Sequence, residues 1–164
     1  MSKFLSLCHQ VVAVDSTCHV PLPASGKQMD KYMYAIGILH KAKLTHSEMC
    51  YGRACVGDSF EFEVILQYRA YQLIKGKKLS DEKRKSRISA LAELVVKHIR
   101  GEKIVRGKKE NTADDYAQVM GCHRDTWYQY KQAYKDLCEW CNDLESDANM
   151  KVWQVLDKEQ EKTK

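Results

Sequence analysis

Proline and long apolar runs are both scarce in this chain. It has two prolines and eight glycines among 164 residues, so we expect a folded chain without long disordered linkers. No apolar run approaches the roughly 20 residues of a membrane-spanning helix. The N-terminal segment also lacks the apolar core and the small-residue cleavage site of a signal peptide. These absences predict a cytoplasmic protein that does not enter a membrane.

The sequence also lacks the motifs that mark common enzyme classes. It contains no GxSxG, no P-loop, no dinucleotide fingerprint and no HExxH pattern. Asp114 and Asp115 are adjacent acids, but acidic residues are typical of the first turn of a helix, where they favour the helix dipole. We therefore expect a protein without enzymatic activity.

What the chain does have is an ordinary supply of apolar and charged residues. Hydrophobic residues make up 44% and charged residues 30%, as in globular proteins with a packed core. The formal net charge is +5 at pH 7, which permits nucleic-acid binding without requiring it. The length suits one compact domain or two small ones.

Apolar residues recur at helical spacing through most of the sequence, which predicts an all-α fold. Residues 1–12 fit either a strand or a helix, and 13–26 predict a loop. Residues 60–75 have two apolar stripes, which predict a central, mostly buried helix. Helix starts are predicted at Thr45 with Glu48 in a capping box, at Asp58 or Ser59, at Ser80, at Thr112, and again at Ser146 or Asp147.

Residues 112–144 predict two helices joined by a tight turn. Ala117 and Gly121 supply a small residue where two helices approach and a residue that tolerates positive φ. The second helix is expected to start at His123 and to continue to Leu144. This pattern predicts a helix-turn-helix, whose second helix enters the major groove of DNA. The alternative is an ordinary helical hairpin with a solvated polar face.

The polar face of the predicted second helix carries donors that suit base edges. Arg124 can pair with guanine, and Gln129 or Gln132 with adenine. For the basic linker before the helices, phosphate contacts and a solvated face are equal alternatives. The residues predicted to contact DNA are His123, Arg124, Thr126, Tyr128, Gln129, Gln132, Lys135, Arg106, Lys108 and Lys109.

The seven cysteines predict free thiols or metal ligands, since disulfides are rare in the cytoplasm. The candidate zinc ligands are Cys8, Cys18, His46, Cys50 and Cys55. Because no CxxC pair occurs among them, we favour buried or surface thiols over a zinc site. No cofactor is therefore expected. Cys138 and Cys141 form a CxxC within an apolar helical stripe, which predicts core positions, with a redox or metal role as the alternative. His40 and His98 fall on apolar faces and are expected in the core.

The residues MGCHRDTWYQYKQAY, preceded by the basic helix ALAELVVKHIRGEK, resemble the antitermination Q proteins of lambdoid-type phages. The resemblance covers about the last third of the chain. It implies DNA binding near a promoter through Arg124, Tyr128, Gln129 and Gln132. It also implies a second surface that loads onto RNA polymerase and makes it ignore terminators. The chain lacks the spaced CxxC pairs of the zinc-containing Q subfamily, so no metal is inferred from the resemblance.

Together these features predict a helical body with a C-terminal helix-turn-helix, divided into a partner-binding region 1–79 and a DNA-binding region 80–164. We expect a sequence-specific transcription regulator that binds double-stranded DNA. A homodimer is expected, because one recognition helix reads few bases, and Trp140, Met150 and Trp153 are candidates for the pairing surface or for the core. The alternatives are a phage interaction factor that inhibits a host protein without binding DNA, and a repressor or DNA-packaging adaptor.

Overall fold

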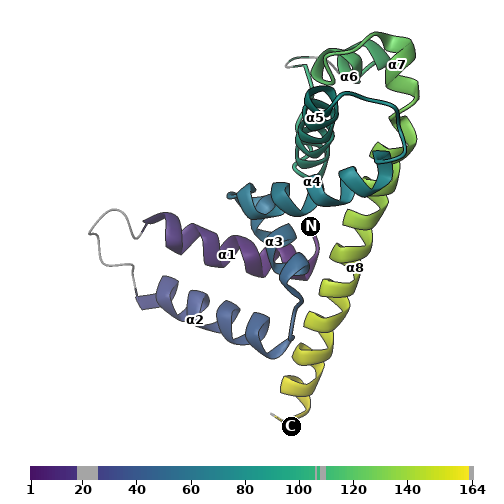
Figure 1. The fold of residues 1–164 in the computed structure, drawn as a ribbon. Helices are drawn as coiled ribbons and strands as arrows, with labels where there is room; N and C mark the ends of the chain where they lie inside the picture. The colour runs from purple at the N-terminus through teal and green to yellow at the C-terminus, as the bar shows by residue number, and fades with distance from the viewer. Residues whose placement is uncertain (18–25, 106, 108–109, 163–164) are drawn as a thin grey trace. The chain divides into compact units, whose positions relative to one another are not determined.

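The computed structural model describes residues 1–17, 26–105, 107 and 110–162. These residues form eight α-helices and no strand (Figure 1), so the predicted all-α class is confirmed. None of the described helices is both long and apolar enough to span a membrane. The chain divides into two compact units, Met1–Asp58 with Asp143–Lys164, and Ser59–Asn142. The division into regions 1–79 and 80–164 falls at a different residue, and the roles assigned to those regions stay a prediction.

The first unit contains α1 (Lys3–Thr17), α2 (Gly26–Lys41), α3 (His46–Val56) and the C-terminal part of α8 (Lys131–Glu161). Helix α1 contacts both α2 and α3. The N-terminal residues are therefore helical rather than extended. Residues 13–17 of the predicted loop belong to α1, and the prediction for residues 18–25 lies outside the described part of the chain. The buried apolar side chains of this unit include Phe4, Leu7, Cys8, Ala35, Ile38, Tyr51, Ala54, Ala148 and Val152.

Gly52 on α3 packs directly against side chains of α1. A Cβ atom at this position would lie 2.6 Å from the Cys8 Sγ and 2.6 Å from the Phe4 Cζ. Because packed interiors leave no room for such an atom, any larger residue at Gly52 would require the Cys8 and Phe4 side chains to move.

A buried carboxylate, that of Glu48, fixes the start of α3. Its Oε2 accepts the Thr45 N–H at 2.6 Å, and the Glu48 N–H donates to the Thr45 Oγ1 at 3.3 Å. The Lys151 Nζ on α8 lies 2.6 and 2.9 Å from the two Glu48 carboxylate oxygens. Burial raises the pKa of Glu48, but the hydrogen bonds from Lys151 and Thr45 outweigh it and hold that pKa below its ordinary value. The predicted capping box is confirmed.

Helix α8 is a single helix of 31 residues. The predicted new start at Ser146 or Asp147 is wrong, because these cap-forming residues lie exposed on the outer face of a helix that continues beneath them. In the first unit, α8 presents Glu145 to the Tyr51 hydroxyl, at 2.7 Å from Oε2, and Asn149 to the Phe4 N–H, at 3.2 Å from Oδ1.

The second unit contains α4 (Phe60–Ile74), α5 (Asp81–Ile99), α6 (Ala113–Val119), α7 (Arg124–Tyr128) and the first residues of α8. Along the chain, α4 packs on α5, α5 contacts α6, and α6 contacts α7. Its buried apolar side chains include Phe62, Leu66, Ala70, Ile74, Leu91, Leu94, Val95, Met120, Trp127, Tyr130, Leu137 and Cys141.

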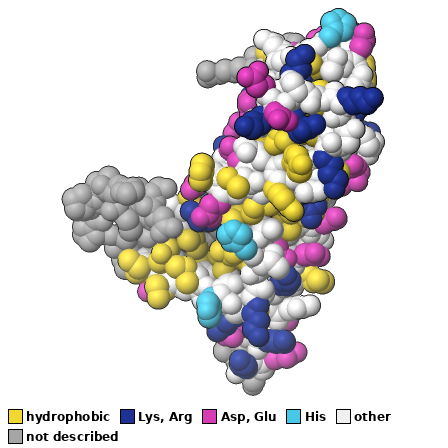
Figure 2. Space-filling model, in the orientation of Figure 1, with side chains coloured by type: hydrophobic (Ala, Val, Ile, Leu, Met, Phe, Trp, Pro, Cys, Tyr) yellow, Lys and Arg dark blue, Asp and Glu magenta, His cyan; other side chains and the backbone are white. Residues whose placement is uncertain are grey.

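Helix α4 buries one face and exposes the other. Its buried residues recur every fourth position from Phe62 to Ile74. On the opposite face Phe60, Val64 and Tyr68 are 73%, 53% and 68% exposed, and Figure 2 shows hydrophobic side chains over α4 on the face in view. The prediction of a mostly buried helix is therefore wrong, because the second apolar stripe is left uncovered.

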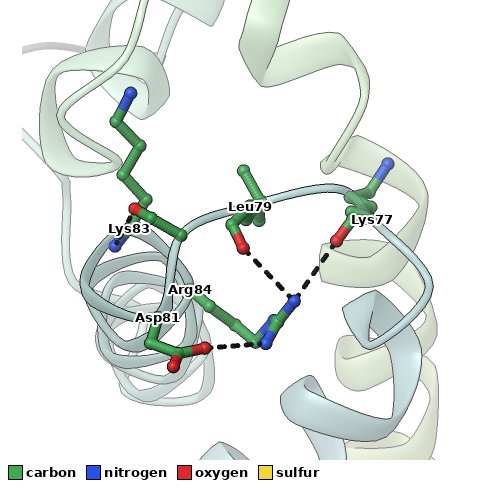
Figure 3. Close-up of polar contacts among 6 residues, drawn as sticks. Lys77, Leu79, Asp81, Lys83 and Arg84 are labelled. Carbon is green, nitrogen blue, oxygen red and sulfur yellow. Dashed lines mark hydrogen bonds and ion pairs between the residues drawn. The ribbon is translucent and has the colours of Figure 1, made fainter.

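Arg84 closes the connection between α4 and α5 (Figure 3). Its Nη2 donates to the carbonyl oxygens of Lys77 and Leu79 at 3.5 and 3.4 Å, and its Nη1 lies 3.1 Å from the Asp81 Oδ1. Ser80 caps α5 through its side chain, so the predicted helix start is confirmed. The guanidinium thus satisfies carbonyl groups that the turn leaves without helical partners.

The Glu48 arrangement predicts a pH-dependent loss of stability. Glu48→Gln should lower the free energy of unfolding at pH 7 by about 1–3 kcal/mol, because a buried hydrogen-bonded charge is lost. Since the folded pKa lies below the unfolded value of about 4.3, the wild-type carboxylate stabilises the fold above that pH and loses its effect as the pH falls through the folded value. Chemical denaturation of both proteins should show the difference narrowing toward pH 3.

Glu159→Gln provides the matched control, because Glu159 also pairs with a lysine, Lys41 at 3.0 Å, but the pair is exposed. Exposed pairs contribute about 0–1 kcal/mol, so this variant should differ little from the wild type. An equal loss for Glu48→Gln at both pH values would contradict the electrostatic role of Glu48.

Candidate nucleic-acid interface

Asp115 organises the start of α6. Its Oδ2 accepts the Thr112 N–H at 2.7 Å and the Thr112 hydroxyl at 2.9 Å. The carboxylate is buried, and these hydrogen bonds offset part of the cost of removing it from water. The predicted cap at Thr112, with Asp115 three residues later, is confirmed.

Gly121 ends α6 with a left-handed turn, at φ 58°. Its N–H donates to the Gln118 carbonyl at 3.0 Å, and the Cys122 N–H donates to the Ala117 carbonyl at 2.9 Å. This pair of hydrogen bonds is the Schellman motif, which needs a residue that adopts positive φ without strain. Ala117 is buried, and the positive φ predicted at Gly121 is confirmed.

The segment after the turn is divided between two helices. His123 caps α7, and its Nδ1 accepts the Asp125 N–H at 3.4 Å. Helix α7 ends at Tyr128, where Gln129 and Tyr130 donate to carbonyl groups three residues earlier, at 3.1 and 2.8 Å. These shorter-range hydrogen bonds tighten the chain, and α8 starts at Lys131. The prediction of one continuous helix from residue 123 to 144 is therefore wrong.

Three aromatic rings hold α6, α7 and α8 together. Tyr116 stacks on Trp127, with ring centroids 4.7 Å apart and planes 5° apart. The Tyr134 ring lies 5.4 Å from Tyr116 and 5.7 Å from Trp127. Each such pair adds about 0.5–1.5 kcal/mol beyond the burial of its area, so this aromatic cluster (Tyr116, Trp127, Tyr134) fixes the short helices in place.

The exposed side of this arrangement carries most of the predicted DNA contacts. His123, Arg124 and Tyr128 extend from α7 or its cap, Gln129 lies at the break, and Thr126 is half-buried. Gln132 and Lys135 are exposed in the first turns of α8. The remaining predicted residues, Arg106, Lys108 and Lys109, lie outside the described part of the chain.

Acidic neighbours moderate the charge of this surface. The Arg124 Nη1 lies 4.0 Å from the Asp114 Oδ2, and the Gln132 Nε2 donates to the Asp136 Oδ1 at 2.7 Å. The hydrogen bond between Arg124 and the Tyr128 side chain raises the pKa of Arg124 above its ordinary value. The Asp114 carboxylate raises this pKa by a smaller amount. Arg124 is therefore a permanent cation, and its exposed ion pair is weak enough to be exchanged for another acceptor.

Lys131 is a residue that the sequence-based site does not contain. It is exposed at the start of α8, and its Nζ lies 5.8 Å from the centre of the Tyr128 ring. Its spacing of four residues from Lys135 places both on one helical face, and this spacing is the pattern that could have identified it.

The two histidines expected in the core are both exposed, so that prediction is wrong. His98 touches the aromatic cluster only from its edge, with its ring centroid 6.1 Å from that of Tyr134. His40 lies at the margin of the buried face of α2. In both helices the apolar stripe is narrower than periodicity suggests.

The candidate zinc ligands do not come together in the described chain. Cys8 and Cys50 are buried, Cys55 is half-buried, His46 is exposed, and Cys18 lies outside the described residues. His46 lies beside Cys50, with Nε2 and Sγ 3.5 Å apart. No group of three or more His, Cys, Asp or Glu side chains in the described segments could hold a metal ion. Burial raises the pKa of the Cys8 thiol to about 12, which keeps it protonated.

Cys138 and Cys141 are both buried on α8, as predicted for core positions. Burial raises the pKa of the Cys138 thiol to about 11. Since the thiolate is the reactive form, this burial makes Cys138 a poor nucleophile.

The chain matches no protein-family model, no curated protein and no solved structure. The resemblance to antitermination Q proteins therefore stays a sequence-based prediction.

The cap of α6 predicts a specific loss of stability. Asp115→Ala should lower the free energy of unfolding by about 1–3 kcal/mol, because it leaves the Thr112 N–H without its acceptor. Thermal or chemical denaturation measures the loss. Asp114→Ala is the matched control on the same helical turn; it is exposed and should cost about 0.3–1 kcal/mol through the helix dipole. Equal losses in the two variants would show that Asp115 acts only as a helix-end charge.

Proposed function

We propose that residues 112–144 form a helix-turn-helix that binds duplex DNA, and that the protein is a sequence-specific transcription regulator. The observation that carries this proposal is the Gly121 turn, which joins two short helices with a packed underside and an exposed polar outer side. A short helix, a tight turn and a second helix presented to solvent are the parts that such modules place against the major groove.

Packing beneath the turn supports the proposal. Ala117, Met120, Trp127 and Tyr130 are all buried under the exposed side chains. The Lys77 Nζ lies 5.1 Å from the centre of the Tyr130 ring and adds a cation–π contact. A rigid underside matters because base recognition requires side chains that are held in a fixed register on the duplex.

The exposed side chains suggest how bases would be distinguished. The Arg124 guanidinium can donate two parallel hydrogen bonds to guanine, and the Gln132 amide can pair with adenine once it releases Asp136. Asp114 and Asp125 oppose a purely electrostatic attraction to phosphate. We therefore propose that specificity depends on directional hydrogen bonds, with Lys135 supplying a phosphate contact.

A role like that of the phage antiterminators would require a second surface for RNA polymerase, and a homodimer would require a pairing surface. Met150 and Trp153 are exposed on α8 and remain candidates for pairing. Trp140 instead packs within its own unit. Its ring stacks on that of Phe62, with centroids 5.8 Å apart, and the Arg69 Cζ lies 3.9 Å from the Trp140 ring centroid.

The exposed apolar face of α4 favours a second candidate function, binding to another protein without DNA. Val64, Tyr68 and Tyr71 form one stripe along this face. A helix face with apolar residues at spacings of three and four is the surface by which helices enter grooves of partner proteins. This candidate includes a host-factor inhibitor, and the same surface would serve a regulator that also binds RNA polymerase.

The DNA-binding proposal is tested by selecting bound duplexes from a random pool and measuring affinity for the enriched site. Affinity should fall steeply with salt concentration. Arg124→Ala should weaken specific binding by about 1–3 kcal/mol, and Arg124→Ala/Gln129→Ala by more. Arg53→Ala is the matched control, because Arg53 is exposed and likewise has a carboxylate neighbour, Asp58 at 3.4 Å.

Unchanged specific binding in Arg124→Ala/Gln129→Ala would remove these residues from the contact surface. If no duplex binds even at low salt, the proposed DNA-binding function is wrong and the interaction function is favoured.

The interaction surface is tested by measuring binding to purified bacterial RNA polymerase. Val64→Glu/Tyr68→Glu should reduce that binding at least about 10-fold while changing the free energy of unfolding by about 0.5 kcal/mol or less, because both side chains are exposed. Met150→Glu/Trp153→Glu makes the same chemical change on an exposed face of α8 and should leave polymerase binding intact. Equal binding by all three proteins would exclude the α4 face as the polymerase contact.

A further inference from the structure

Two adjacent pockets flank the aromatic cluster in the second unit. The first, of about 300 Å³, is lined by Trp127, Tyr128, Lys131 and Lys135. The second, of about 250 Å³, is lined by Lys97, His98, Lys103 and Ile104. Asn111, Tyr116 and Tyr134 line both pockets. The two pockets are therefore neighbours on either side of these shared residues, and we call the pair the tandem pocket.

The walls of the tandem pocket are preformed. Tyr116 and Tyr134 are held by contacts with Trp127, and the Asn111 Oδ1 accepts the Ile104 N–H at 3.1 Å, which fixes the amide between the two recesses. Because these side chains already have partners that orient them, a planar ligand could bind without the entropic cost of ordering the site.

Lysines outnumber acidic residues at the rim of the tandem pocket, where the one lining carboxylate, that of Glu102, lies 3.8 Å from the Arg100 guanidinium. Lys131 and Lys135 are exposed at the first pocket, one helical turn apart, and Lys103 is exposed at the second. None of these three lysines has an ion-pair partner among the described residues, whereas Lys97 is neutralised by Glu93 at 2.7 Å. Three uncompensated cations beside an aromatic recess favour a ligand that combines planar rings with negative charge.

Nucleotides have this combination of a planar base and a phosphate. The first pocket is at the lower end of the size range of small-molecule sites and the second is slightly smaller, so each suits a ligand no larger than one base with its sugar. Two pockets in succession, with cations beyond each, suit consecutive nucleotides of a strand better than one free nucleotide. Bases in a duplex are stacked on one another, so only unpaired bases could enter. Proteins that bind single strands combine a positive groove with aromatic side chains in the same way.

We propose that the tandem pocket binds two successive unpaired nucleotides of a single nucleic-acid strand. The bases pack against Tyr116, Tyr134 and Tyr128, and the phosphates contact Lys131, Lys135 and Lys103. This activity goes beyond the proposed recognition of duplex DNA and does not depend on it, because base reading in a duplex is assigned to Arg124, Gln129 and Gln132, and Lys135 alone is given a phosphate contact in both.

The proposal is tested by fluorescence anisotropy with a labelled oligothymidylate of about ten nucleotides, a length within the range that single-strand sites cover. Lys131→Ala/Lys135→Ala should weaken binding at least about 10-fold, and Tyr128→Ala should weaken it in the same direction. Lys83→Ala/Lys85→Ala removes the same charge from exposed positions on α5 and should have a small effect. Unlabelled thymidine monophosphate should compete far more weakly than the unlabelled strand.

Each of these outcomes would overturn the proposal: no binding of the single strand, equal weakening by the two double-lysine variants, or competition by thymidine monophosphate at the same concentration as the strand. A separate arm uses Arg124→Ala/Gln129→Ala, which should still bind the single strand even if it no longer binds duplex DNA. Loss of single-strand binding in that variant would show that both ligands use one surface, and would also overturn a separate site.

Discussion

Burial of a carboxylate is the constraint on which both units depend. Glu48 and Asp115 are the buried charged side chains of the described chain, and each lies three residues after the threonine that precedes its helix. A buried charge persists only where hydrogen bonds replace its water. Each carboxylate therefore fixes the residue at which a helix begins, α3 in one unit and α6 in the other, and the packing of later residues follows from that start.

The helix boundaries at Thr45, Ser80 and Gly121 could be predicted from the sequence because their causes are local. A threonine or serine cap and a glycine turn are recognisable within a few residues. The uncovered face of α4 could not be predicted, since apolar periodicity does not say whether a second element covers it. The break at Gln129 also has no sequence signature, because glutamine is an ordinary helix residue.

Part of the candidate interface was also predictable, because it depends on local sequence pattern. Helical periodicity separates Arg124 and Gln132 from the buried Trp127, and all three lie as that pattern indicates. The tandem pocket is different. It forms where residues from α5, α6, α7 and α8 meet, and its lining residues Leu94 and Lys135 are far apart in the chain. Only the tertiary packing shows that the lysines of α8 border an aromatic recess.

The shortness of α6 and α7, seven and five residues, has a consequence for dynamics. Isolated helices below about 12–15 residues are marginal in water, so these two persist only while they pack on their neighbours. Their amides should open to solvent exchange more readily than those of α5, because their protection depends on few contacts. A ligand that binds only the closed form would slow this opening by mass action. Occupancy of the interface is thus coupled to the local folding equilibrium of the residues that form it.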